Sequence, residues 1–190
     1  MSTKTNYLQS QGDFFHIYNR GVNRESIFFE SRNSDYFLQR IAEYYDPEKM
    51  EIVAYCLMPN HFHFIVRQIT AFGITDFFQG VCGGYVKAVN KAYDRSGHLF
   101  EGKYKMKLIE SNEYLLHLSR YIHLNPVRAK LVEQPENWEF SSCGMYYGRE
   151  SEIVINSDYV LRQLNGITGY KEFVQNYEPE DKKKIDRLLF

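Results

Sequence analysis

The sequence lacks the features of fibrous, disordered and disulfide-stabilised proteins. Of its 190 residues, only 12 are glycine, 5 are proline and 3 are cysteine. The cysteines, Cys56, Cys82 and Cys143, form no CxxC pair, which argues against a disulfide framework and a zinc ribbon. A reducing cytoplasm fits this cysteine usage best. With 44% hydrophobic and 25% charged residues, the chain is expected to form a globular domain.

Apolar segments that would insert into a membrane are missing as well. No apolar run approaches the roughly 18 residues that cross a bilayer. The stretch MSTKTNYLQSQGD at the start has no apolar core of a signal peptide. We therefore expect a cytoplasmic protein that makes no contact with a membrane.

Neither sign of charge predominates in the chain as a whole, but the charged residues are unevenly distributed along it. The net charge is −1, yet residues 84–130 carry 9 positive and 4 negative side chains, and residues 131–160 carry 1 and 6. Two interpretations are open: the basic segment contacts a polyanion, or it pairs with the acidic segment within the fold. The aromatic content of 16% leaves a similar choice, because Tyr and Phe stack on unpaired bases and also fill cores.

Hydrophobic periodicity predicts strands interleaved with helices. Ser34 is the expected N-cap of the first helix, and Pro126 is expected to end or kink the last long one. This order favours an α+β domain with a largely antiparallel sheet and helices on its faces. The predicted strands are 13–19, 26–30, 50–57, 61–68 and 99–109, and the predicted helices are 35–45, 75–93 and 113–124, followed by a small strand and helix within 155–175 and a charged helix or tail at the end.

The pair His61 and His63 is the first candidate for chemistry. At i and i+2 on a strand, both imidazoles point to the same face and can share one metal ion. Phe62, Phe64 and Val66 take the opposite face and would anchor the strand in the core. The alternative is a pair of half-exposed strand histidines with no ligand.

Tyr121 and Asn125 are the second candidate. They stand at i and i+4 on one face of a predicted helix, with His117 one turn earlier. Tyr121 supplies a phenol nucleophile, and Asn125 supplies an amide oxygen that suits a hard cation. The alternative is a tyrosine packed on the sheet and an asparagine that caps the helix before Pro126.

The two candidates fit one mechanism. Two imidazoles and one amide would leave positions open on Mg²⁺ or Mn²⁺ for oxygens of a scissile phosphate, which the metal would polarise. A phenol has a pKa of about 10, so the metal and nearby cations would have to activate it. Attack by tyrosine conserves the phosphodiester energy in a phosphotyrosine, so a second hydroxyl can reverse the reaction.

Alternating lysines form the third candidate. Lys103, Lys105 and Lys107 share one face of the predicted strand 99–109 and could track a phosphate backbone together with residues of the preceding helix. The alternative is a solvated strand face. His16 and His98 have no partner at ligand spacing and are taken as ordinary residues. The helix residues that join this predicted basic surface are Lys87, Lys91 and Arg95.

Several motifs, in order, resemble a known family. MPNHFHFIV, NKAYDRSGHLFEGKYK and YLLHLSRYIHLNPVRAKLV are preceded by FHIYNRGVNRESIF and followed by NWEFSS. Together they resemble the HUH single-tyrosine transposases, and most closely the REP-associated tyrosine transposases. The resemblance covers about residues 13–148, so we take 1–148 as the transposase domain. Residues 149–190 would be a C-terminal extension, such as a DNA-binding or oligomerisation arm.

The resemblance implies a fold and a set of roles. The fold would be an RRM-like or ferredoxin-like antiparallel sheet with the HUH pair on a central strand and the catalytic tyrosine on a helix. His61 and His63 would be the HUH pair, Asn125 the third ligand of Mg²⁺ or Mn²⁺, and Tyr121 the nucleophile, with Tyr114 as the fallback. We also expect Arg120 and Arg128, beside Tyr121, to contact DNA.

Family members cut single-stranded DNA beside small hairpins, forming a 5′-phosphotyrosine and a free 3′-hydroxyl. The resemblance therefore implies hairpin DNA as the partner and association with the nucleoid. Both monomers and homodimers that exchange the tyrosine helix occur in the family, and both stay open here. Two other functions also remain: a domesticated hairpin-binding protein that does not cut, and a small-molecule metalloenzyme that uses the histidine pair.

Overall fold

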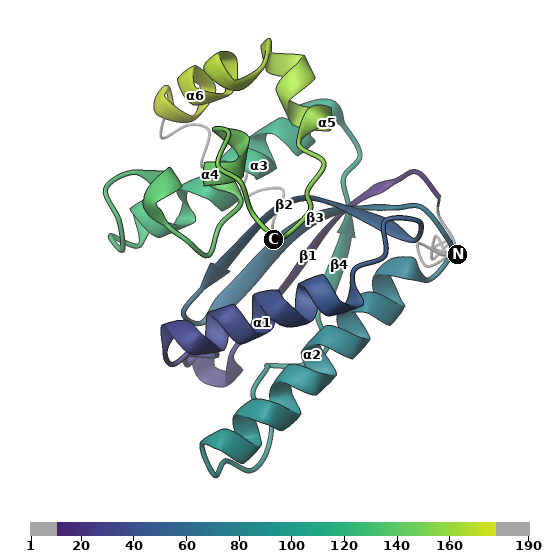
Figure 1. The fold of residues 1–190 in the computed structure, drawn as a ribbon, viewed down its shortest axis with the longest axis vertical. Helices are drawn as coiled ribbons and strands as arrows, with labels where there is room; N and C mark the ends of the chain where they lie inside the picture. The colour runs from purple at the N-terminus through teal and green to yellow at the C-terminus, as the bar shows by residue number, and fades with distance from the viewer. Residues whose placement is uncertain (1–10, 178–190) are drawn as a thin grey trace, which may run out of the picture.

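The computed structural model describes residues 11–177 and shows a four-stranded antiparallel sheet. The sheet order is β2-β3-β1-β4, and helices cover both of its faces (Figure 1). This confirms the predicted α+β class, and β3, which carries His61 and His63, is an inner strand. The strands are β1 (Phe14–Arg20), β2 (Met50–Met58), β3 (His61–Gln68) and β4 (Lys105–Leu108).

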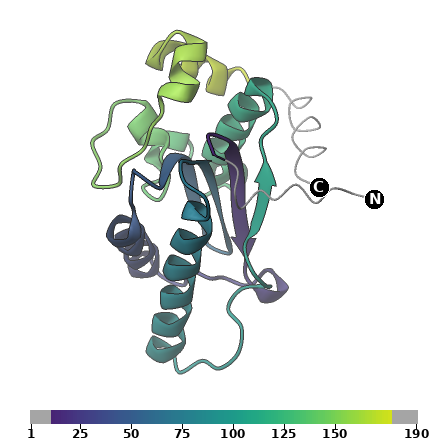
Figure 2. The same cartoon turned by 90° about the vertical axis from the view of Figure 1, so that its right-hand side faces the viewer.

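One face of the sheet is an apolar layer covered by two helices. Successive residues of a strand point to opposite faces, so every second side chain of β1 and β3 belongs to this layer. The helices α1 (Ser31–Tyr44) and α2 (Gly73–Ala92) pack against each other across it (Figure 1, Figure 2). The fully buried side chains that β1 and β3 contribute are Phe15, Ile17, Phe62, Phe64 and Val66.

Helix α1 begins earlier than the sequence pattern predicts. Its N-cap is Glu30 rather than Ser34, and the Asn33 side chain accepts hydrogen bonds from the backbone N–H groups of Phe29 and Glu30, at 2.9 and 3.1 Å. These bonds satisfy backbone donors ahead of the helix. The helix therefore includes residues 31–34, which the prediction left outside it.

The predicted strand at residues 26–30 is wrong. The backbone N–H groups of Ile27 and Phe28 both donate to the carbonyl oxygen of Pro59, at 2.8 and 3.0 Å. The segment therefore crosses the turn between β2 and β3 instead of pairing along a strand. Both side chains are buried in the core, which accounts for the apolar run that suggested a strand.

Strand β4 is shorter than the predicted strand 99–109. The Asn19 side chain donates to the carbonyl oxygen of Gly102 at 3.0 Å, and the Glu101 N–H donates to the Arg20 carbonyl at 2.9 Å. Residues 99–104 thus follow the end of β1 through isolated bonds rather than a ladder. As a result, Lys103 precedes the strand, and only Lys105 and Lys107 lie on it.

Helix α3 (Asn112–Arg128) covers part of the opposite sheet face. Ser111 caps it, because its hydroxyl oxygen accepts a hydrogen bond from the Tyr114 N–H at 3.1 Å. The predicted apolar stripe of Leu115, Leu118 and Ile122 is buried against β2 and β3.

The prediction that this helix ends near Leu124 is wrong. Pro126 lies inside α3, although it has no N–H to donate to the preceding turn. The last turn still closes, because the Ala129 N–H donates to the Asn125 carbonyl at 3.0 Å. Pro126 lies in the last turn of the helix, which ends two residues later.

The chain beyond α3 folds back onto this helix. Tyr170 and Val174 are buried in the same apolar cluster as Ile65 and Ile122, so the described part of the predicted extension shares a core with the sheet. The helix predicted within 155–175 is present, but no strand forms there. The elements are η3 (Pro135–Asn137), α4 (Cys143–Tyr146), α5 (Asp158–Leu161), η4 (Arg162–Leu164) and α6 (Ile167–Gln175).

Two sequence-based expectations concern the ends of the chain and the membrane. The charged helix or tail expected at the end falls largely on residues 178–190, outside the described residues, and the domain boundary at 148 stays a prediction. In the described range 11–177, no helix has both the length and the apolar character to span a bilayer.

A buried polar network ties α3 to the segments that follow it. The imidazole of His123 contacts the Tyr170 hydroxyl through Nδ1 at 2.6 Å and the Ser142 hydroxyl through Nε2 at 2.8 Å. The Ser142 oxygen in turn accepts from the Tyr55 N–H of β2 at 2.8 Å. Burial lowers the pKa of His123 from 6.5 to about 3, so the imidazole is neutral at pH 7.

This network predicts how stability depends on pH. Unfolded His123 takes up a proton below pH 6.5, whereas the folded residue does so only near pH 3. Stability should therefore fall as the pH drops from 6.5 towards 3, with His123 contributing about 1.4 kcal/mol per pH unit. Urea unfolding at pH 7, 6 and 5 should show a shallower pH dependence for His123→Gln.

The matched control is His98→Gln, which removes an exposed histidine of the loop after α2. The difference between the two variants isolates the buried site from other histidines. An equal slope in both variants would show that His123 is not the buried neutral group described here.

Candidate active site

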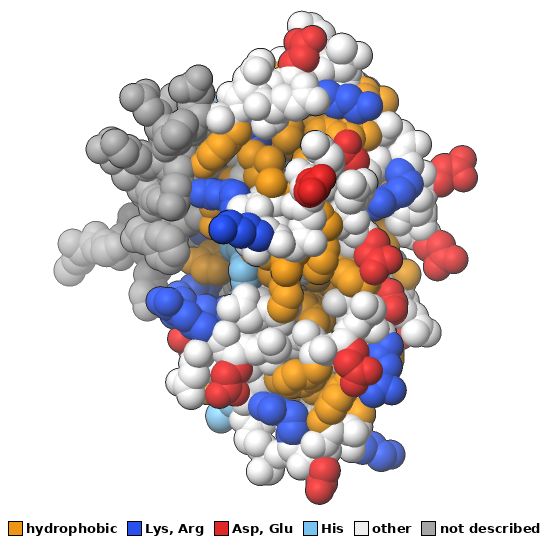
Figure 3. Space-filling view, turned by 90° about the vertical axis from the view of Figure 1, so that its left-hand side faces the viewer, with side chains coloured by type: hydrophobic (Ala, Val, Ile, Leu, Met, Phe, Trp, Pro, Cys, Tyr) orange, Lys and Arg blue, Asp and Glu red, His pale blue; other side chains and the backbone are white. Residues whose placement is uncertain are grey.

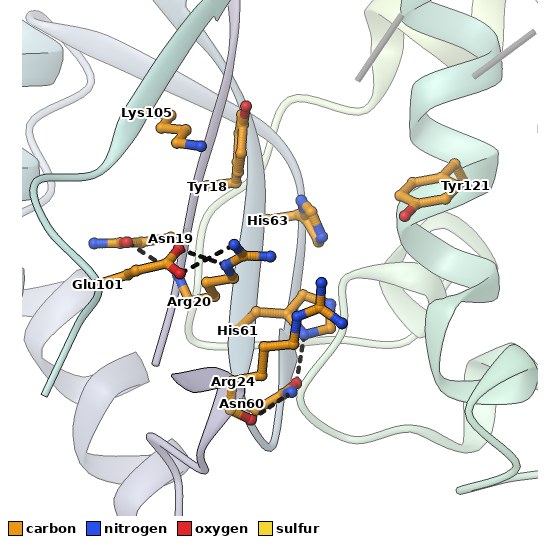
Figure 4. Close-up of a pocket in the computed structure, with 10 residues that line it drawn as sticks. All are labelled: Tyr18, Asn19, Arg20, Arg24, Asn60, His61, His63, Glu101, Lys105 and Tyr121. Carbon is orange, nitrogen blue, oxygen red and sulfur yellow. Dashed lines mark hydrogen bonds and ion pairs between the residues drawn. The ribbon is translucent and has the colours of Figure 1, made fainter. Parts of the chain in front are cut away.

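A cavity of about 360 Å³ lies on the sheet face that α3 partly covers. Figure 4 shows Tyr121, from α3, at one end, the histidine pair of β3 in the middle, and Arg20, Glu101 and Lys105 at the other end. The cavity thus brings the predicted nucleophile together with two of the three predicted metal ligands, His61 and His63. Its lining residues are Tyr18, Asn19, Arg20, Arg24, Asn60, His61, His63, Glu101, Lys105 and Tyr121.

The tautomer of His61 is determined by Asn60. The Asn60 amide nitrogen donates to the carbonyl oxygen of Arg24 at 3.0 Å, so its Oδ1 faces the Nδ1 of His61, 2.6 Å away. Because an amide oxygen only accepts hydrogen bonds, the proton of neutral His61 is on Nδ1. Burial, with a smaller effect from the positive charge of Arg20, lowers the pKa of His61 to about 4. Its Nε2 therefore carries a free lone pair at pH 7.

His63 has a buried histidine partner that the sequence analysis missed. The Nδ1 of His63 lies 2.9 Å from the Nε2 of His16, and the two rings stack with centroids 5.1 Å apart. His16 pairs with Ile65, and His63 with Tyr18, across β1 and β3, so the two histidines are diagonal neighbours on one face. The view of His16 as an ordinary residue is wrong. Burial, then the charges of His16 and His61, lower the pKa of His63 well below 6.5.

Tyr121 faces this pair from α3. Its ring centroid lies 5.9 Å from that of His63, and the guanidinium carbon of Arg128 lies 5.0 Å from the Tyr121 ring. The fallback, Tyr114, is 5% exposed and does not line the cavity. Burial raises the pKa of Tyr114 to about 12, which disfavours the phenolate needed for attack. Tyr18, which does line the cavity, is a better alternative than Tyr114.

Asn125 lies one helical turn beyond Tyr121, as predicted, and is 9% exposed. Its amide nitrogen is buried without a hydrogen-bond partner. The residue is not among those that line the cavity, so its predicted role as a ligand stays a prediction. Across residues 11–177, no cluster of three or more His, Cys, Asp or Glu side chains is arranged to hold a metal.

The predicted basic residues do not form one surface. Lys105 lines the cavity, and Lys107 lies beside His16 on the same sheet face. Lys87 and Lys91 lie on α2, which packs on the opposite face, and Arg95 stacks over the exposed ring of Phe29 at 5.3 Å. Figure 3 shows one face on which positive and negative side chains are interspersed, without a broad field of one sign.

Arg120 is placed differently from the prediction that it contacts DNA. It is 3% exposed, and its guanidinium donates to the Phe173 carbonyl and to the Nδ1 of His117, both at 2.9 Å. The guanidinium also packs on the Phe173 ring at 4.0 Å. This burial contradicts the predicted DNA contact, and the residue instead connects α3 to α6.

Two further cationic residues of the cavity, Arg20 and Arg24, were not predicted. The stretch RGVNRE gives no periodic signal, and its position depends on contacts with Asn60 and Glu101, which are distant in sequence. His16 could have been found only from the register of β1 against β3.

Comparison with known proteins identifies the class. Residues 13–125 match the family model "Transposase IS200 like", which is more than half of the 190 residues. The chain therefore belongs to the IS200-like transposase family, as the sequence motifs predicted. No curated protein matches it.

Among solved structures, the chain is similar to one described as a REP-associated tyrosine transposase bound to a REP hairpin. The identity is 18%, the TM-score is 0.64, and the likeness covers 83% of this chain and 93% of the other. This likeness shows a shared fold. A transposase structure from Deinococcus radiodurans R1 has 16% identity over 64% of this chain and 95% of its own, with a TM-score of 0.43, which is too low to support an argument.

The contact between Asn60 and His61 generates a prediction. Removing the acceptor with Asn60→Ala should move the His61 proton from Nδ1 towards Nε2, because the tautomer depends on the bond made by the other nitrogen. Long-range ¹H–¹⁵N NMR of the imidazoles at pH 7 measures this directly. Asn60→Asp, which keeps an acceptor oxygen, should retain the Nδ1 proton. An Nε2 proton on His61 in the unmodified protein would contradict the assignment.

Proposed function

We propose that this protein cuts and rejoins single-stranded DNA through a covalent bond to Tyr121, as a metal-dependent transesterase. The observation that carries the proposal is the placement of Tyr121 against the His61 and His63 pair in one cavity with three cationic side chains. Membership of the transposase family supports the class of reaction.

The proposed step is a transfer of one phosphodiester bond. The Tyr121 oxygen attacks the phosphorus, a new bond forms between them, and the bond from phosphorus to the 3′-oxygen breaks. The phenol proton passes to solvent, and the released 3′-oxygen takes up a proton. The product is a 5′-phosphotyrosine and a free 3′-hydroxyl, and attack by a 3′-hydroxyl on the phosphotyrosine restores the diester.

The histidine pair fits a divalent cation. Each imidazole is neutral and has its Nδ1 engaged, by Asn60 for His61 and by His16 for His63. This is the usual arrangement of ligating histidines, whose second nitrogen is held by an outer partner. If Nε2 of His63 is the ligand, its Nδ1 carries the proton and donates to His16.

We propose Mg²⁺ or Mn²⁺ as the cation, with Asn125 as a further ligand. When bound, the cation would polarise the scissile phosphate and offset the charge that develops on it. Of these two cations, imidazole ligands favour Mn²⁺. Asn125 would bind such an ion through its amide oxygen.

We propose hairpin-forming single-stranded DNA as the substrate. The solved structure that shares the fold is described as bound to a REP hairpin. In this chain, Arg20, Arg24 and Lys105 line the cavity with one carboxylate, Glu101. Because the imidazoles are neutral, the cavity is net cationic and suited to phosphate.

Covalent trapping tests the nucleophile. Mixed with Mn²⁺ and 3′-labelled hairpin oligonucleotides, the protein should form an adduct that is visible on a denaturing gel. Tyr121→Phe should reduce this adduct by more than about 10³-fold, since it removes the attacking oxygen, and should leave binding intact. Tyr114→Phe and Tyr18→Phe are matched controls and should retain the adduct.

An adduct that persists in Tyr121→Phe but not in Tyr18→Phe would reassign the nucleophile. Tight binding of the same hairpins without any metal-dependent adduct would favour the second function, a hairpin-binding protein that does not cut.

Cation binding tests the role of the outer partner. His16→Leu should weaken Mn²⁺ affinity by about 10- to 100-fold, because it removes the group that orients His63. His16→Gln retains a hydrogen-bond acceptor and should lose less Mn²⁺ affinity. His98→Gln should bind Mn²⁺ as tightly as the unmodified protein. Calorimetric titration of the DNA-free protein provides the measurement. Equal Mn²⁺ affinity for His16→Leu and the unmodified protein would contradict this role.

A further inference from the structure

The cavity contains three cationic side chains besides its histidines, and within residues 11–177 only one of them, Arg20, forms an ion pair. Arg20 donates to both carboxylate oxygens of Glu101, one of them at 3.0 Å. This bond, with smaller effects from Lys105 and Arg24, lowers the pKa of Glu101, so the carboxylate is charged at neutral pH. Arg20 and Glu101 thus neutralise each other and leave Arg24 and Lys105 as the net positive charge.

The Arg24 side chain lines the cavity and makes no hydrogen bond or ion pair to any of the described residues. Figure 4 shows it beside His61, with Lys105 and Tyr18 across the cavity. Lys105 is also exposed, and its ammonium group lies 5.7 Å from the centroid of the Tyr18 ring. Arg24 is therefore an exposed cation that lines the cavity without an ion pair among the described residues.

The backbone holds Arg24 in an unfavourable conformation. Its φ is 62°, and that of Asn23 is 53°, in the left-handed region that side chains other than Gly, Asn and Asp avoid. The Arg24 N–H donates to the Gly21 carbonyl at 3.0 Å, and the Arg24 carbonyl accepts from the Asn60 side chain at 3.0 Å. Gly21 is required, because a Cβ there would collide with the Glu25 carbonyl.

Strain of this kind persists where surrounding contacts impose it, and it is common at ligand clamps. Here the imposing contact is Asn60, the same residue that orients His61. The position of Arg24 is thereby coupled to that of the proposed metal ligand.

The geometry of the proposed reaction indicates which DNA strand these cations would contact. In phosphoryl transfer, the attacking and leaving oxygens lie roughly in line on opposite sides of phosphorus. With Tyr121 at one end of the cavity and the histidine pair in the middle, the leaving 3′-oxygen points to the far end. A strand that leaves the histidine pair in that direction starts beside Arg24, which lies next to His61, and then passes Lys105 (Figure 4).

We infer that Arg24 is the anchor of a leaving-strand subsite, binding a phosphate of the DNA strand that ends in the freed 3′-hydroxyl. This inference rests on the proposed function and specifies where one of its two product strands is held. The subsite keeps the 3′-hydroxyl strand available, which the rejoining reaction requires. Lys105 contributes charge on the other side of the same strand.

Rejoining kinetics test this subsite. The covalent adduct is isolated, and a strand ending in a 3′-hydroxyl is added at increasing concentration. Arg24→Gln should raise the concentration for half-maximal rejoining by about tenfold, as expected for loss of one charged hydrogen-bond partner. The maximal rate should be unchanged, and Arg24→Lys should restore part of the affinity.

Arg32→Gln is the matched control, because Arg32 pairs with Glu30 on α1 and does not line the cavity. It should behave like the unmodified protein. An unchanged half-maximal concentration in Arg24→Gln, or an equal rise in the control, would overturn the inference.

Two measurements separate the subsite from the proposed function. With the unmodified protein, a methylphosphonate linkage that neutralises one phosphate near the 3′-hydroxyl should raise the half-maximal concentration, and in Arg24→Gln the same linkage should have little further effect. If the unmodified protein forms no adduct, the proposed function fails. Binding of the 3′-hydroxyl strand to Tyr121→Phe, with and without Arg24→Gln, then still decides for or against the subsite.

Discussion

The antiparallel pairing of β1 with β3 is the constraint on which the candidate site depends. Its register sets His63 opposite Tyr18 and His61 opposite Arg20, so one sheet face receives these four polar side chains of the cavity. Because side chains alternate, a slip of one residue in β3 would move both histidines into the apolar layer under α1 and α2. Phe62, Phe64 and Val66 oppose such a slip, since it would expose them.

The second constraint is the attachment of α3, which brings Tyr121 to the histidines. Its apolar stripe packs on the sheet, and His123 and Arg120 connect its other sides to Ser142, Tyr170 and Phe173. These bonds are buried, so moving α3 would leave polar groups without partners in a region of low dielectric constant. The described chain beyond residue 125, where the family match ends, thus takes part in positioning Tyr121.

Local patterns predicted much of this fold and part of the site. Strands β1 to β3 and helices α1 to α3 follow from periodicity, and the motifs around His61 and Tyr121 indicated the family. The errors share a cause, which is contact between residues distant in sequence. Ile27 and Phe28 are buried although they form no strand, and their apolar run led to the wrong strand prediction. Contacts of residues 99–104 with the end of β1, such as the Asn19 bond to Gly102, replace the predicted first half of β4. Arg120 is buried by its contacts with α6. The sequence analysis did not identify His16, Asn60 and Arg24, because the position of each depends on a partner in another part of the chain.

The bonds of Asn60 also bear on the order in which the parts of the site fold. The β2–β3 hairpin is local in sequence, whereas β1 must close a loop of more than forty residues to reach it, and such closure is the slower event. The histidine pair can therefore be in place on the hairpin before Gly21 reaches the Asn60 carbonyl. Until that contact forms, Arg24 lacks the Asn60 bond to its carbonyl that helps to hold its left-handed conformation. On this order, a folding chain places the histidine pair before it places Arg24 beside it.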